Sequence, residues 1–174
     1  MEQITDQNAV ALTTRNADLS SMVELLRTQQ AAKTDHVVAA SALAAQGGQM
    51  LVHGAGRSEL SMDGVTTGDL TLAPTRTADN GIADKLGIPA AYLRRTREQN
   101  IDLYDDNVNG WLTHRPDRRF LVRGLTDGDS RHGVMRALLS DRYRPIENLD
   151  VLMTCLDGIR EADHPVHIVS ADLS

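Results

Sequence analysis

The chain has few aromatic residues and a single cysteine. One Trp, one Phe and three Tyr make up 3% of its 174 residues, so the core must consist of Leu, Val, Ile, Ala and Met, and an aromatic-lined ligand cage is not expected. Cys155 has no partner for an internal disulfide. It falls on the apolar stripe of a predicted helix, and we expect it to be buried there by packing. A lone thiol fits a reducing compartment, which predicts the cytoplasm.

Long hydrophobic runs are also absent. No segment approaches the roughly 20 consecutive apolar residues that a membrane-spanning helix requires. The N-terminal residues 1–6 have neither the basic start nor the apolar stretch of a signal peptide. We therefore expect no membrane association.

The residues that catalysis or metal binding would need are not grouped in the sequence. His164 and His167 are three apart on a predicted extended segment, so their rings would point to opposite faces. The glycine pair Gly54 and Gly56 follows a predicted strand, but no Lys follows where a phosphate-binding loop needs one. No Ser or Cys has the context of a nucleophile. We predict that the protein is not an enzyme and holds no metal or cofactor.

Lysine is scarce, with only Lys33 and Lys85 among 18 basic residues. The overall charge of −6 argues against a general affinity for nucleic acid. The charge is uneven, however: residues 94–144 carry 11 Arg and eight acidic residues, a net charge of +3, against −4 for residues 1–93 and −5 for residues 145–174. A GC-rich genome explains an excess of Arg, but guanidinium groups also suit phosphate and carboxylate partners.

Hydrophobic periodicity predicts an α+β fold with helices packed on an antiparallel sheet. Residues 1–17 are polar and predict a flexible arm, and residues 18–174 predict a single domain. The first helix is expected over 18–33, with a capping box formed by Ser21 and Glu24. Further helices are predicted over 76–86, from Pro89, over 104–112 and over 149–159, and strands over 50–53, 69–73, 119–123, 133–139 and 165–169.

A helix-turn-helix-like corner is predicted at about 76–97. Ala83 is followed four residues later by Gly87, which ends the first helix, and then by the apolar Leu93, a spacing that packs two helices across a tight turn. If this corner reads DNA, Arg94 and Arg95 face the groove and its phosphates. The alternative is an ordinary corner between two helices in a core.

A basic strip is predicted around the hairpin of strands 119–123 and 133–139. Arg119 and Arg123 share one face of the first strand, and Arg136 lies on the second. Arg142, Tyr143 and Arg144 follow at the corner that leads into the last helix. Proteins that bind single-stranded nucleic acid combine such cations with stacking aromatics. The alternative is a solvated sheet face whose cations pair with neighbouring carboxylates.

Three blocks resemble a family of phage and plasmid proteins of unknown function. They are 72–75 with 86–95, then 107–112, and then 136–144 with 148–152. The resemblance covers most of residues 18–173 and implies an origin in a mobile element of a bacterial host. Family members are usually longer and have a second half rich in strands, so we expect this chain to correspond to an N-terminal or truncated copy. The resemblance implies no catalytic residues.

Two functions remain open on these observations. The first is binding of single- or double-stranded nucleic acid during phage recombination or replication, carried by Arg94, Arg95 and the residues of the basic strip. The second is a protein-interaction module that engages a host or phage protein through the acidic segments, without nucleic acid.

Overall fold

A computed structural model describes residues 11–62, 64–128, 130–162 and 168–173. Its contacts divide the chain into two units. The larger unit is Lys33–Tyr143, and the smaller unit combines the described parts of Met1–Ala32 and Arg144–Ser174. The sequence predicts one domain over 18–174 behind an arm. The division into two units arises because the two end segments of the chain pair with each other, and residues 14–17 of the expected arm form a strand.

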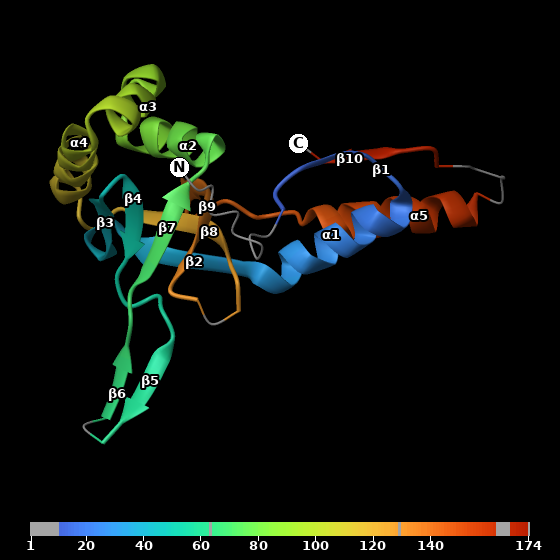
Figure 1. Cartoon of the computed structure of the whole chain (residues 1–174), viewed down its shortest axis with the longest axis horizontal. Coiled ribbons are helices and arrows are strands. Elements are labelled where there is room, and N and C mark those ends of the chain that lie inside the picture. Colours follow the sequence, from blue (N-terminus) through green and yellow to red (C-terminus); the bar gives the residue numbers. More distant parts are fainter. Residues whose placement is uncertain (1–10, 63, 129, 163–167, 174) are drawn as a thin grey trace, which may run out of the picture. The chain divides into compact units, whose positions relative to one another are not determined.

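The larger unit is built on a six-stranded sheet (Figure 1). The strands in spatial order are β2 (Lys33–Ala39), β8 (Arg119–Thr126), β9 (His132–Ser140), β7 (Leu70–Pro74), β4 (Gln49–Val52) and β3 (Leu43–Gln46). The expected α+β class and the antiparallel β8–β9 hairpin are confirmed. The sheet is mixed, because β7 and β9 run parallel; the chain between them forms three helices and β8 before it returns.

A separate hairpin extends from this sheet in Figure 1. It consists of β5 (Ser58–Ser61) and β6 (Gly64–Thr67), which pair only with each other. The side chains of Leu60 and Val65 are 84% and 68% exposed. The hairpin therefore adds little to the core.

Three helices follow β7: the first and third pack on the sheet, and the second packs on the other two helices. They are α2 (Arg76–Leu86), α3 (Ala90–Gln99) and α4 (Ile101–His114), and a short 3₁₀ turn, η1 (Ala40–Ala42), links β2 to β3. The predicted corner at 76–97 is present as a pair of helices. Thr75 caps α2 by accepting a hydrogen bond from the Ala78 N–H, and Gly87 ends the helix at a left-handed φ of 74°.

The hydrophobic core belongs almost entirely to the larger unit. Of the 24 buried hydrophobic side chains in the described residues, 22 lie between residues 33 and 143. Aliphatic residues dominate them, as the composition predicts, with Tyr104 and Phe120 as the two aromatic members. This core holds the ends of α2, α4 and β8 in fixed positions relative to one another.

The smaller unit contains β1 (Thr14–Ala17), α1 (Leu19–Ala32), α5 (Asn148–Glu161) and β10 (Ala171–Leu173), with β1 and β10 antiparallel. The expected first helix is present, but the expected capping box is wrong. Asp18 caps α1 instead, since its carboxylate accepts hydrogen bonds from the Ser21 N–H at 2.9 Å and the Ser21 hydroxyl at 2.8 Å. The carboxylate is the stronger acceptor, and these bonds lower the pKa of Asp18.

Two further expectations for the smaller unit concern Cys155 and the predicted strand 165–169. Cys155 is exposed rather than buried, because α5 contains no buried residue at all. The predicted strand 165–169 falls partly outside the described residues. The strand that the structure describes in this region is β10, which begins at Ala171.

Candidate nucleic-acid interface

The predicted face of β8 is present, but one of its arginines is already paired. Phe120 and Val122 point into the core, so Arg119 and Arg123 lie on the opposite face. The Arg123 Nε donates to Asp35 Oδ2 at 3.0 Å, and the Arg123 side chain is 12% exposed. The two residues are direct neighbours in the β2–β8 register. Arg123 therefore neutralises Asp35 within the sheet, a partner that the sequence does not suggest because it lies 88 residues away.

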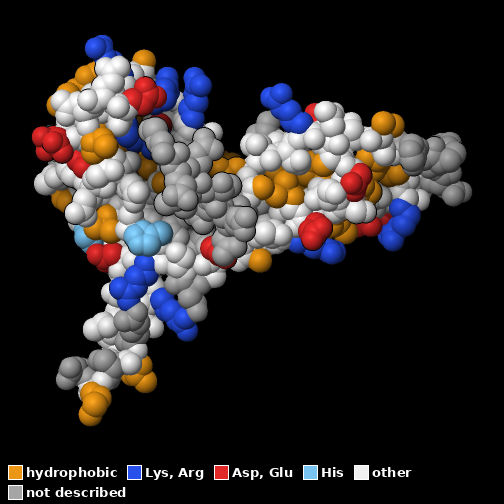
Figure 2. Space-filling view, in the orientation of Figure 1, with side chains coloured by type: hydrophobic (Ala, Val, Ile, Leu, Met, Phe, Trp, Pro, Cys, Tyr) orange, Lys and Arg blue, Asp and Glu red, His pale blue; other side chains and the backbone are white. Residues whose placement is uncertain are grey.

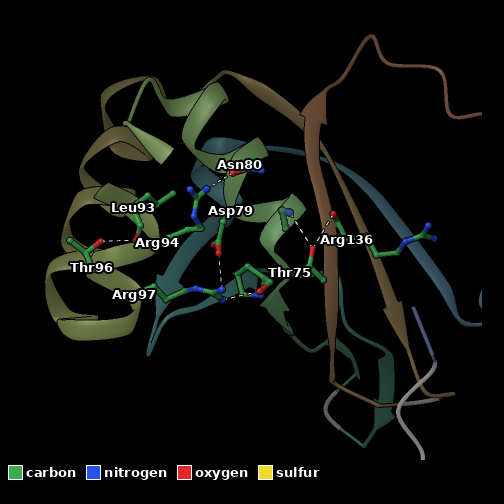
Figure 3. Close-up of polar contacts among 10 residues, drawn as sticks. Thr75, Asp79, Asn80, Leu93, Arg94, Thr96, Arg97 and Arg136 are labelled. Carbon is green, nitrogen blue, oxygen red and sulfur yellow. Dashed lines mark hydrogen bonds and ion pairs between the residues drawn. The ribbon is translucent and has the colours of Figure 1, made fainter. Parts of the chain in front are cut away.

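Arg136 lies at an irregularity of β9. Arg123 is paired with Ala137 and Gly124 with Met135, which leaves Arg136 as the extra residue of a bulge. Its side chain points away from α2 (Figure 3), and its carbonyl oxygen accepts a hydrogen bond from the Thr75 hydroxyl at 3.4 Å. It forms no ion pair with a carboxylate of the described residues. Arg136 thus lies on the face of the sheet opposite to α2 and is partly exposed.

Arg94 and Arg95 are held by neutral side chains on the helices. The Arg94 Nη1 donates to Asn80 Oδ1 at 2.5 Å (Figure 3), and the Arg95 Nε donates to Gln99 Oε1 at 3.0 Å. Neither partner is a carboxylate, and both arginines lie on α3, apart from the hairpin strands. The structure therefore does not bring all eight candidate residues together.

The next turn of α3 contains an ion pair with the buried Asp79 that no sequence pattern indicated. Arg97 Nη2 lies 2.7 Å from Asp79 Oδ2, and Arg97 Nη1 donates to the Pro74 carbonyl at 2.8 Å (Figure 3). Asp79 is 1% exposed, and burial raises its pKa although Arg97 acts in the opposite direction. The pair joins α3 to α2 and to the end of β7, so we assign it a structural role.

Arg119, at the start of β8, and Arg142, in the turn after β9, lie at the same end of the sheet. Ser140, the last residue of β9, is paired with Phe120, the residue that follows Arg119. A turn follows, in which the Tyr143 N–H donates to the Ser140 carbonyl at 2.9 Å. Arg142 lies within this turn and is exposed, as are Arg119 and Tyr143. Arg144 belongs to the smaller unit, as the first residue of its C-terminal segment.

A cavity of about 370 Å³ opens beside this end of the sheet. Its lining combines the end of α2, the end of α4 and the start of β8, and includes Lys85, Trp111, His114, Arg115, Arg118 and Phe120. Arg118 is fixed at its wall: its Nη1 donates to the Lys85 carbonyl at 2.5 Å, and its guanidinium lies 5.0 Å from the centre of the Phe120 ring. The Lys85 ammonium contacts Asp84 Oδ2 at 2.7 Å.

Trp111 is the exposed aromatic side chain of this cavity. The helical spacing predicts that it shares a buried face with Tyr104, Val108 and Leu112, and those three are buried. Trp111 is 47% exposed, and its ring meets the His114 ring edge-on at 5.9 Å. One step of an α-helix turns by about 100°, which is enough to move Trp111 from the core side of α4 to its flank.

We define the basic end as Lys85, Arg115 and Arg118, which line the cavity, together with Arg119 and Arg142, which lie outside it at the same end of the sheet. These five cations come from α2, the α4–β8 connection, the start of β8 and the turn after β9. Asp84 lines the same cavity and pairs with Lys85, while Asp117 and Asp141 are carboxylates nearby in sequence. Residues 33–143 carry 14 basic and 14 acidic residues, so the larger unit is neutral and the net charge of −6 resides in residues 1–32 and 144–174. The net acidity of the chain is therefore not carried by the unit that contains the basic end.

The sequence signal for the basic end is the segment 115–119, which contains three arginines around Pro116 and Asp117. Arg115 and Arg118 precede the predicted strand 119–123, so its alternating pattern gave no prediction for them. Lys85 was missed because it precedes Gly87 by two residues and looks like an ordinary helix terminus. Its proximity to the start of β8 depends on tertiary packing.

No helix in the described ranges is both long and apolar enough to cross a membrane. The same residues contain no group of three or more His, Cys, Asp or Glu side chains suited to a metal ion. His164 and His167 lie outside the described residues. Comparison of the chain with models of protein families, with curated proteins and with solved structures finds no match. The resemblance to phage and plasmid proteins therefore stays a prediction.

Proposed function

We propose that this protein binds single-stranded nucleic acid at the basic end of its larger unit, as an accessory protein of a phage or plasmid in the bacterial cytoplasm. The observation that carries the proposal is the convergence of Lys85, Arg115 and Arg118 around an exposed Trp111 in one cavity. Cations that follow a phosphate backbone and an aromatic ring that stacks on a base are the two components of single-strand recognition.

Single strands fit this site better than a duplex does. Bases are available for stacking only when they are unpaired, and Trp111 lies in a concave site with Arg115 and Arg118 beside it. The basic end also lacks a protruding helix that could enter a major groove, since its cations lie at helix ends, at a strand start and in a turn. Arg94 and Arg95 on α3 form the alternative duplex-reading surface.

The proposal predicts binding that weakens steeply with salt. If four of the five cations of the basic end contact phosphates, raising the salt from about 50 to about 200 mM weakens the affinity for a single strand about 50-fold. The measurement is fluorescence anisotropy of a labelled oligothymidylate of about 12 nucleotides, titrated with the full chain at four salt concentrations.

A duplex of matched length serves as the comparison in the same titration. The proposal predicts tighter binding of the single strand at every salt concentration. Failure of both ligands to bind at about 50 mM salt contradicts the proposal. Tighter binding of the duplex also contradicts the proposal, because it favours the alternative duplex-reading surface on α3.

A further inference from the structure

The six-stranded sheet has two edges, and the edge at β3 is closed by side chains of α4. The Asn109 amide binds both backbone groups of Ala45: its Oδ1 accepts from the Ala45 N–H at 2.7 Å, and its Nδ2 donates to the Ala45 carbonyl at 2.9 Å. One turn earlier on α4, the Asp105 carboxylate accepts hydrogen bonds from the N–H groups of Gly47 and Gly48 at 2.6 and 3.1 Å. These side chains occupy backbone groups that a further strand would need, so the sheet cannot be extended beyond β3 without displacing them.

The edge at β2 is open instead. Among the described strands, β2 pairs only with β8, and the Ala40 N–H continues this register by donating to the Arg118 carbonyl. Because the direction of the backbone groups alternates along an antiparallel strand, the N–H and C=O groups of Asp35, Val37 and Ala39 point away from β8. None of these groups forms a hydrogen bond in the part of the chain that the structure describes. Their regular spacing matches the backbone of another extended strand.

The side chains along this edge favour a second copy of the same strand. Val37 is 46% exposed and lies on the side of the sheet opposite the main core, since its neighbour Val38 packs against that core. The Asp35 carboxylate is already paired with Arg123. Residues 33–143 have no net charge, so two copies of the larger unit do not repel each other through an excess of either sign.

We propose that two copies of this chain join through their β2 strands, which run antiparallel about a two-fold axis at Val37. This register opposes Val37 to the partner's Val37 and Asp35 to the partner's Ala39, so that the outward backbone groups exchange about six hydrogen bonds. The two valine side chains cover each other as a cross-strand pair. Because the edge at β3 is closed, the assembly ends at two copies and does not grow into a fibre. The proposal does not depend on nucleic-acid binding.

Sedimentation velocity of the full chain from about 1 to about 200 µM tests the proposal, because dimerisation depends on protein concentration. A contact between two strands is small for a protein interface, so we expect a weak dimer with a dissociation constant on the order of 10 µM. Val37→Pro should leave a monomer at every concentration, because Pro removes the outward N–H and its ring blocks a second strand. The Val37 N–H is not part of the ladder with β8, so Pro is compatible with this edge position.

A second variant keeps the backbone N–H. Val37→Lys places two ammonium groups opposite each other at the axis and should weaken the dimer at least about tenfold. Val65→Lys is the matched control, because Val65 is 68% exposed on the β5–β6 hairpin, whose far end carries hydrophobic side chains apart from the sheet (Figure 2). Its dissociation constant should stay within about threefold of the original. Circular dichroism should be the same for all these proteins.

A cysteine at the axis tests the register. In a Cys155→Ser background, Val37→Cys should form a disulfide between the two copies on mild oxidation, since the Cα atoms of directly opposed residues lie about 5.5 Å apart. Ala39→Cys should form none, because this register separates the two Ala39 Cα atoms by about 14 Å.

Each of three results overturns the proposal. A monomer at the highest concentration leaves the β2 edge to a strand of another protein. A dimer that both Val37 variants preserve and Val65→Lys dissociates places the interface on the hairpin. A disulfide formed at position 39 but not at position 37 contradicts the two-fold register.

Discussion

Replacing Arg115, Arg119 and Arg142 together with Glu is expected to weaken binding of single-stranded oligothymidylate about 100-fold at about 50 mM salt. All three side chains are exposed, and none forms an ion pair with a carboxylate of the described residues. Three attractive contacts with phosphates become repulsive, so the salt dependence should also fall by about two in the slope of log K against log salt. Lys85 and Arg118 stay unchanged because Arg118 supports the end of α2.

A matched triple variant separates local contacts from overall charge. Arg76, Arg94 and Arg95 are three arginines of α2 and α3, and their replacement with Glu changes the charge of the same unit by the same amount. We expect the affinity of this variant for the oligothymidylate to fall less than about fivefold, because salt screens repulsion between the distant introduced charges and the phosphates. A larger loss in this variant than in the basic-end variant would place the interface on the helix corner. Unfolding midpoints measured in parallel exclude a loss of structure.

Gly81→Ala should lower the free energy of unfolding of the larger unit by about 3 kcal/mol. Gly81 lies in α2, and a Cβ atom added there would be 2.6 Å from the Leu138 carbonyl oxygen and 3.1 Å from the Leu138 nitrogen. Both atoms belong to the backbone of β9, so only a shift of the helix or the strand relieves the clash. A shift of α2 would also displace Lys85, which lies one turn further along the helix.

Gly110→Ala is the control for this substitution, since it introduces the same methyl group into another helix. Nothing lies within 4 Å of a Cβ atom at Gly110 in α4. The higher helix propensity of Ala should therefore raise the stability by as much as about 1 kcal/mol. Urea unfolding followed by Trp111 fluorescence measures both variants. Equal effects of the two substitutions would contradict the close packing of α2 on β9.

The sequence predicted the local elements better than their partners. Thr75, Gly87 and the apolar periodicity between them are enough to define α2, because caps and side-chain spacing act within a few residues. The parallel pairing of β7 with β9, and the pairing of β1 with β10, join distant segments and left no local signal. The same limit applies to the division of the chain into two units.

The candidate site was predicted only in part for the same reason. Alternation on β8 correctly placed Arg119 and Arg123 on one face, but it could not reveal that Asp35 comes from β2 to pair with Arg123. Periodicity assigned Trp111 to the core side of α4, although it lies at the flank and is half exposed. Lys85 joins the basic end only through packing of α2, which no spacing rule describes.

Trp111 provides the most direct measurement of whether the basic end binds nucleic acid. It is the single tryptophan of the chain and lines the same cavity as Lys85 and Arg115. Stacking of a base on its ring should quench the fluorescence in proportion to the bound oligothymidylate, and about 200 mM salt should restore it. An oligonucleotide that binds by anisotropy while the Trp111 emission stays unchanged would contradict the central claim.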